Sequence, residues 1–292
     1  MNRKKHKKTR LALIFLEVFT FVLAVGLGGI FLLAGQKQRE GVASKESVPT
    51  ETKVEIKEDI SKPVEENNIS EDDGESGGKY DTLLNDAEEM ERQRIYLKET
   101  NSSEYVTLLF AGDVGLAEGY AILGNLLSRG GNIEQGFDAN TLLAMRSADI
   151  FMVNNEFTYT NRGVPTEDKQ YTFRSNPENV KYLLDMGVDV VSIANNHTYD
   201  YGEISLTDTI DTLRNANMPY VGAGYNIEEA VKPVYFIAND LRIAIVSATQ
   251  IERVSNPDTK GATANSPGVF RCFNNDRICE VIKEAKECSD YV

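Results

Sequence analysis

Side chains of the kinds that bind divalent metal ions occur shortly after three apolar runs of the sequence. Asp113 follows VTLLFA, and Glu156 follows ADIFMV. Asn196 and His197 follow VDVVSIA. Carboxylate and amide oxygens and an imidazole nitrogen suit Mn²⁺, Mg²⁺, Zn²⁺ or Fe. Together these residues predict a metal hydrolase site, whereas each of them alone also suits a turn or a helix N-cap.

The apolar runs at 106–111, 148–153 and 188–194 predict buried β-strands, because they are short and continuous. Between them, Asn176-Pro177 predicts a helix start and 204–216 an amphipathic helix. The remaining predicted elements are a strand at 219–222, a hairpin of strands 234–238 and 241–248 joined by Asn239-Asp240, and a helix at 275–287. Strands alternating with helices predict an α/β domain, with its site at the carboxyl ends of the strands.

Composition excludes one class of partner and one kind of site. The formal net charge is −14, from 45 acidic and 31 basic residues. Nucleic-acid binding needs Lys and Arg to neutralise phosphates, so we expect no nucleic-acid partner. The chain has two histidines, His6 and His197, which excludes a site built within this chain from several imidazoles.

The N-terminal region predicts a membrane anchor. Residues 1–10 carry six Lys or Arg and no acid, which is typical of a cytoplasmic tail. The apolar run at 11–34 can span a hydrocarbon core of about 30 Å as a helix. We therefore expect a single-pass signal-anchor in the cell membrane, with an extracytoplasmic domain. A cleaved signal peptide is the alternative, for which Leu33-Ala34-Gly35-Gln36 offers a weak site.

Residues 35–104 are rich in Lys, Glu, Ser, Asn and Asp and poor in aromatic residues. Such a composition does not bury enough apolar area to offset the entropy of ordering. We expect a disordered acidic linker at 35–104 and a globular domain at 105–292.

Several motifs in the globular region occur in a fixed order. They are AGDVGL (111–116), NNEF (154–157), Lys169 with Phe173-Arg174 and Pro177, ANNH (194–197), Asp200-Tyr201-Gly202 and GAG (222–224). From about Val106 onward the chain thereby resembles the bacterial capsule-synthesis family, CapA or PgsA-like, which is associated with poly-γ-glutamate capsule production.

The resemblance implies a calcineurin-like metallophosphoesterase fold, which is a β-sandwich flanked by helices. It also implies that Asp113, Glu156, Asn196 and His197 hold a divalent metal ion. Asp113 and His197 would be the catalytic residues, with His197 as a proton donor to a leaving oxygen.

For substrate binding, the resemblance implicates four residues of the matching motifs, Lys169, Arg174, Asn195 and Asp200. Lys169 and Arg174 suit an anionic polymer or a phosphoester. For Arg174 an ion pair with Asp200 is the alternative.

The sequence also departs from the family. It lacks the later His-Trp-Gly block, since it has no Trp and no His after His197. We therefore expect an incomplete domain at the C-terminal end. The predicted function is capsule biosynthesis at the membrane, alongside membrane-bound polymer synthase subunits. The alternatives are a non-catalytic assembly or export subunit and a generic surface metallophosphatase.

The predicted anchor can be tested on intact cells that produce the full-length chain. Added protease should remove the domain and leave a short membrane stub, because the basic end stays cytoplasmic. Recovery of the whole domain from the culture medium, beginning near residue 36, would favour signal-peptide cleavage instead.

Overall fold

The computed structural model describes residues 78–250 and 260–292, which belong to one compact unit, Asp72–Val292. The predicted tail at 1–10, the predicted span at 11–34 and the linker as far as residue 77 lie outside the described residues. No helix in the described part of the chain is long and apolar enough to cross a membrane.

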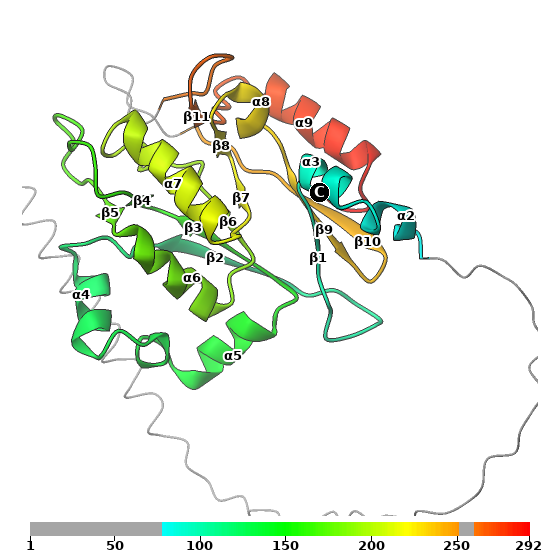
Figure 1. The fold of residues 1–292 in the computed structure, drawn as a ribbon, viewed down its shortest axis with the longest axis horizontal. Helices are drawn as coiled ribbons and strands as arrows, with labels where there is room; N and C mark the ends of the chain where they lie inside the picture. Colours follow the sequence, from blue (N-terminus) through cyan, green and yellow to red (C-terminus); the bar gives the residue numbers. More distant parts are fainter. Residues whose placement is uncertain (1–77, 251–259) are drawn as a thin grey trace, which may run out of the picture. The chain divides into compact units, whose positions relative to one another are not determined.

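A four-stranded parallel sheet carries the ends at which the candidate site lies (Figure 1). In spatial order its strands are β2 (Leu108–Val114), β3 (Ile150–Asn155), β6 (Val190–Ser192) and β7 (Tyr220–Val221). Helices connect these strands, as parallel pairing requires. They are α4 (Ala121–Ser128), α5 (Ala139–Ser147), α6 (Lys181–Met186) and α7 (Glu203–Asn215), with the 3₁₀ helices η1 (Ile133–Gln135) and η2 (Pro177–Val180).

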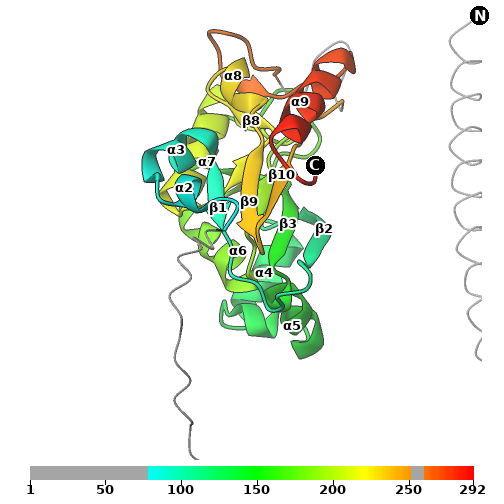
Figure 2. The same ribbon diagram turned by 90° about the vertical axis from the view of Figure 1, so that its right-hand side faces the viewer.

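A second sheet, in the order β1-β9-β10, mixes parallel and antiparallel pairing. Its strands are β1 (Ile95–Leu97), β9 (Val234–Ala238) and β10 (Leu241–Ile245). Figure 2 shows it beside α2 (Asp81–Leu84), α3 (Ala87–Gln93) and α9 (Asp276–Glu287). The smaller elements are β4 (Thr158–Tyr159) paired with β5 (Arg174–Ser175), β8 (Ala223–Gly224) paired with β11 (Gly268–Val269), and α8 (Ile227–Ala230).

Alternating side chains divide the core into layers. In β3, Ile150 packs between the two sheets, whereas Phe151 packs toward the helices that follow β2. In β9, Phe236 lies between the sheets and Tyr235 faces the layer that holds β1 and α9. Since side chains alternate across a strand, each sheet has apolar contacts on both faces. The result is a mixed fold of sheets and helices, which confirms the expected α/β class.

Most of the predicted elements are confirmed to within a few residues. The predicted helix at 204–216 is α7, and the one at 275–287 is α9. The predicted hairpin is β9 and β10, joined by Asn239 and Asp240 with φ of 50° and 56°. Positive φ at both positions matches the type I′ turn that two-residue hairpins favour.

The expectation that the first strand is buried is wrong. β2 pairs with β3 on one side only and forms an edge of the sheet. Phe110 is 59% exposed there. The apolar sequence predicts a strand, but it does not specify the number of neighbours that the strand has in the sheet.

The expectation of a disordered linker up to residue 104 is also wrong, for residues 78–104. β1 forms a parallel pair with β9 in register from Ile95 with Tyr235 to Leu97 with Ile237. Lys98 forms an ion pair with Asp189 at 2.5 Å. The sequence around β1 is mostly charged or polar, although one of its residues, Ile95, is buried. The pairing of β1 with β9 also forms backbone hydrogen bonds, which cannot be predicted from composition.

A substitution in β1 tests whether this segment belongs to the domain. Ile95→Ala in the full-length chain should lower the free energy of unfolding by about 2–4 kcal/mol, because a buried aliphatic side chain is lost. Leu97→Ala, in the same strand but 59% exposed, should change it by less than about 0.5 kcal/mol. Equal urea midpoints for both variants would show that β1 does not contribute to the fold.

Candidate functional site

The register of the parallel sheet brings the predicted site residues to one edge. Asp113 of β2 pairs with Asn154 of β3, and Asn154 pairs with Ser192 of β6. Glu156 follows β3 directly, and the Asn195 to His197 segment follows β6. Three successive strand ends therefore contribute to one polar cluster, as expected for an α/β sheet.

A chain of amide hydrogen bonds orients the two carboxylates. The backbone N–H of His197 donates to Asn195 Oδ1 at 3.0 Å, so the Asn195 amide nitrogen must face the other way. That nitrogen donates to Asn154 Oδ1 at 3.0 Å. The Asn154 amide nitrogen then donates to Asp113 Oδ1 at 2.8 Å and also to Glu156. A backbone donor thus fixes the direction of every bond in the chain and leaves both carboxylates as acceptors.

Asp200 fixes the ring of His197 from the opposite side. Its side chain is completely buried, and Oδ2 lies 2.7 Å from His197 Nδ1. Lys169 Nζ lies 2.6 Å from Oδ1, and the backbone N–H of Phe173 donates to Oδ2. The Phe173 ring lies 4.2 Å from the His197 ring between centroids. Because a carboxylate only accepts, the Nδ1 of a neutral His197 must carry the proton, which leaves Nε2 without one.

The free ring nitrogen faces a carboxylate. His197 Nε2 lies 3.9 Å from Glu156 Oε1, too far for a hydrogen bond, and both atoms are acceptors. Metal–ligand bonds are about 2.1 Å long. Two ligand atoms of one ion are therefore about 3.0 Å apart when their bonds meet at a right angle, and about 4.2 Å apart when they lie on opposite sides of the ion. The separation therefore fits one divalent ion between Glu156 and His197.

The negative charges around Glu156 influence its protonation. Burial, followed by the nearby negative charge of Asp113, raises the pKa of Glu156 above its ordinary value of 4.5. His197 and the amide of Asn154 act in the opposite direction. A bound cation would remove part of this electrostatic cost.

The side chains at the strand ends supply some, but not all, of the ligands that a metal ion needs. Among residues 78–250 and 260–292, no three His, Cys, Asp or Glu side chains are placed to hold a metal ion together. A hollow of about 350 Å³ does lie at the strand ends, and its lining includes Asp113, Asn154, Glu156 and Asn196. An ion there would need amide oxygen or water in addition to Glu156 and His197.

The residues expected to contact substrate have different surroundings. Asn195 is buried, with both ends of its amide engaged, and Asp200 holds His197 and Lys169, so both act as positioning residues here. The Lys169 side chain is 6% exposed. Arg174 does not pair with Asp200. Its guanidinium lies 4.6 Å from the centre of the Tyr201 ring.

Sequence reasoning missed Asn154 as a site residue. It lies inside the NNEF motif, two residues from a predicted ligand, but an asparagine at a strand end is also an ordinary turn residue. The direction of its hydrogen bonds depends on Asn195, which is 41 positions away. That long-range pairing is not visible in local spacing.

Known proteins match this chain over its globular part. The model of the family described as bacterial capsule synthesis protein PGA_cap matches residues 107–292. The chain is 34% identical over 152 residues to the PGA biosynthesis protein CapA of Bacillus subtilis, covering 50% of this chain and 38% of that protein. It is 31% identical over 133 residues to a probable polyglutamine synthesis accessory protein of Mycobacterium tuberculosis, covering 46% and 35%. It is 32% identical over 120 residues to the capsule biosynthesis protein CapA of Bacillus anthracis, covering 41% and 28%. The aligned part is thus less than two fifths of each of these relatives.

The raised pKa of Glu156 predicts a pH-dependent stability difference. A carboxyl whose pKa is higher in the folded than in the unfolded chain destabilises the fold at pH values above its ordinary pKa. With a chelator present, Glu156→Gln should therefore raise the thermal midpoint at pH 7. The gain should vanish as the pH falls below about 4.5, where the carboxyl is protonated in both states.

Glu99→Gln, at an exposed position, controls for the loss of one negative charge. A Glu156→Gln variant that is less stable than the parent at pH 7, or equally changed at every pH, would contradict the electrostatic account.

Proposed function

Because the chain belongs to the bacterial capsule synthesis protein family, we propose that it takes part in producing a polyglutamate-type capsule polymer. Two similar proteins support this proposal by their names, which are PGA biosynthesis protein CapA and probable polyglutamine synthesis accessory protein. We place the domain outside the cell membrane, anchored by residues 11–34, where it would meet a membrane-bound synthase and the growing anionic polymer.

The chemical part of the proposal is metal-dependent hydrolysis in a metallophosphoesterase-like domain. One observation carries it. His197 Nε2, with Nδ1 engaged by Asp200, faces Glu156 at 3.9 Å across a gap that suits a cation. Asp113, Glu156, Asn196 and His197 would hold a divalent ion such as Mn²⁺, Mg²⁺, Zn²⁺ or Fe. When bound, the ion would supply positive charge that polarises the bond to be broken.

The protein's own groups set the rest of the chemistry. Asp200 keeps the His197 ring in one orientation, so that Nε2 faces Glu156. There Nε2 would either bind the ion or take up a proton and then donate it to a leaving oxygen, but not both at once. Asn154 holds the two carboxylates in place by donating to both. Arg174 remains the basic residue for an anionic substrate, since Lys169 is used to neutralise Asp200.

A second candidate function is a non-catalytic subunit that helps to assemble or export the polymer. The observation in its favour is that the described residues contain no cluster of three His, Cys, Asp or Glu side chains suited to a metal ion. The two functions differ in one measurable property, which is whether a metal ion binds through His197.

Calorimetric titration of Mn²⁺ into the detergent-solubilised full-length chain separates these functions. His197→Gln should weaken Mn²⁺ binding by at least about tenfold, because one ligand is lost. His6→Gln, which replaces the other histidine, should leave binding unchanged. Hydrolysis of a nitrophenyl phosphodiester should require Mn²⁺ and disappear in the His197 variant. If the parent chain binds no Mn²⁺, or the His197 variant binds it equally well, the non-catalytic function takes its place.

A further inference from the structure

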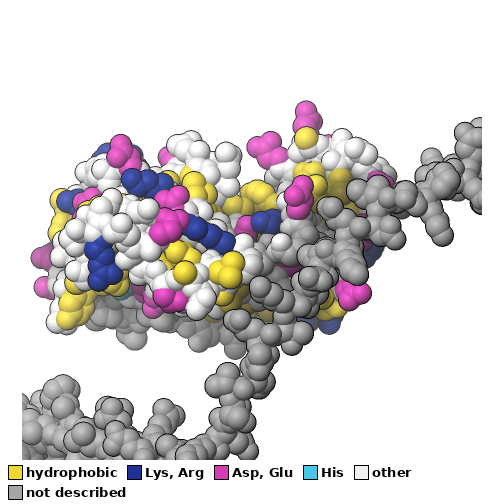
Figure 3. Space-filling model, turned by 90° about the horizontal axis from the view of Figure 1, so that it is seen from below, with side chains coloured by type: hydrophobic (Ala, Val, Ile, Leu, Met, Phe, Trp, Pro, Cys, Tyr) yellow, Lys and Arg dark blue, Asp and Glu magenta, His cyan; other side chains and the backbone are white. Residues whose placement is uncertain are grey.

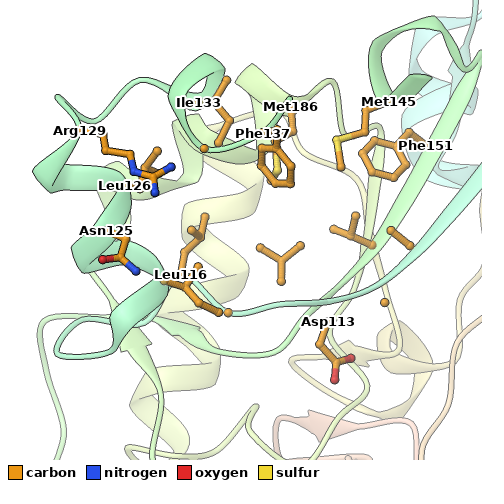
Figure 4. Close-up of a pocket in the computed structure, with 17 residues that line it drawn as sticks. Asp113, Leu116, Asn125, Leu126, Arg129, Ile133, Phe137, Met145, Phe151 and Met186 are labelled. Atoms are coloured by element: carbon orange, nitrogen blue, oxygen red, sulfur yellow. The ribbon is translucent and has the colours of Figure 1, made fainter. Parts of the chain in front are cut away.

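A cavity of about 470 Å³ lies between the four-stranded sheet and helices α4 and α5 (Figure 4). It is separate from the hollow that is lined by Glu156 and Asn196, although Asp113 borders both. Most of its lining is apolar and includes Leu126, Ile133, Phe137, Met145, Phe151 and Met186. Its volume is within the range of about 300–1,000 Å³ that is typical of small-molecule sites.

Missing side chains on β2 and just beyond its end help to create the space. Gly112 and Gly115 both line the cavity. A Cβ atom at Gly112 would meet no other atom within 4 Å, and one at Gly115 would meet only Ile122, at 3.5 Å. An ordinary core would fill this space with side chains, since protein interiors are closely packed. A side chain at either position would therefore have room, and the two glycines leave the β2 side of the cavity open.

One end of the cavity is polar and cationic. Figure 4 shows Asn125 and Arg129 together on one side, with the guanidinium directed toward the interior. Arg129 Nη1 donates to the carbonyl of Gln135 at 3.0 Å, which holds the group at the rim. Asp113 is the other charged residue of the lining, and its carboxylate points away from the apolar side chains and accepts from Asn154. The polar end is therefore suited to an anion.

The outer surface next to the cavity is also apolar. Helix α4, with the sequence AILGNLLS, contains no charged residue. Leu123 and Leu126 face the core, while Ile122 and Leu127 are 62% and 54% exposed. Figure 3, seen from the side of the domain that carries α4 and α5, shows hydrophobic patches between the charged groups. A helix that is apolar on both faces commonly contacts an apolar partner on its outer side.

We propose that this cavity binds the acyl chain of an anionic amphiphile. The chain lies among Phe137, Met145 and Phe151, and the anionic head accepts hydrogen bonds from Arg129 and Asn125. An arginine at the mouth of an apolar cavity favours such a ligand over a neutral hydrocarbon, because charge-assisted hydrogen bonds add affinity and direction. A free fatty acid and an anionic lipid of a bilayer share this chemistry.

The absence of tryptophan allows a direct test. Phe137→Trp in the full-length chain places a single fluorophore in the cavity wall, and Ile122→Trp provides a second reporter at an exposed lining position. Phe273→Trp, at a position outside the cavity lining, is the matched control. Bromododecanoic acid, added below its micellar concentration, should quench the fluorescence of both reporter variants but not that of the control variant. Unbrominated dodecanoic acid should reverse the quenching.

The headgroup is tested with bromododecanol, which has the same chain without the charge. The acid should bind at least about tenfold more tightly than the alcohol, and Arg129→Gln should abolish this difference. Vesicles containing a brominated anionic phospholipid show whether the ligand is a bilayer lipid or a free fatty acid. Quenching by vesicles alone identifies a bilayer lipid, and quenching by the free acid identifies a soluble amphiphile. Absence of quenching in both reporter variants, equal quenching of the control variant, or equal affinity for acid and alcohol would overturn the proposal.

Discussion

The candidate site depends on the buried carboxylate of Asp200. It holds two segments together, because it contacts His197 in its own turn and Lys169 and the backbone of Phe173 in the preceding loop. A carboxylate with no exposed surface is tolerated only when it is paired, and the loss of one partner of such a pair typically costs about 3–5 kcal/mol. The loop and the end of β6 are therefore held together, and the His197 ring takes its orientation from this pairing.

The other half of the site depends on the parallel sheet. Asp113, Asn154 and Ser192 are neighbours because β2, β3 and β6 are in register. Asn154 lies on β3, which pairs with a strand on each side, and Asn195 is buried just after β6, so the two amides can form a directed chain of hydrogen bonds. That chain begins at the backbone of His197 and ends at the two carboxylates. Asp200 and the asparagines thus fix His197 and Glu156 relative to each other from opposite sides.

Local sequence predicts local features of this protein well. Apolar runs locate β3 and β6, Asn239-Asp240 locates the hairpin turn, and Asn176 is the N-cap of η2, as expected. Features that depend on neighbours in space are not predictable in this way. The edge position of β2 depends on strand order, and the inclusion of β1 depends on pairing with a strand more than one hundred residues later. The positioning roles of Asn195 and Asp200 likewise depend on groups from other segments, although their positions follow from the strand ends.

The most direct test of this account is the proton position on the His197 ring, measured by long-range ¹H–¹⁵N correlation on the full-length chain with a chelator present. The chain has two histidines, so the His197→Gln variant identifies the signals. For the neutral ring of His197 the account predicts a proton on Nδ1, donated to Asp200, and an unprotonated Nε2 facing Glu156. A neutral ring with its proton on Nε2 would contradict the account, because the nitrogen facing Glu156 could then neither bind a metal ion nor accept a proton.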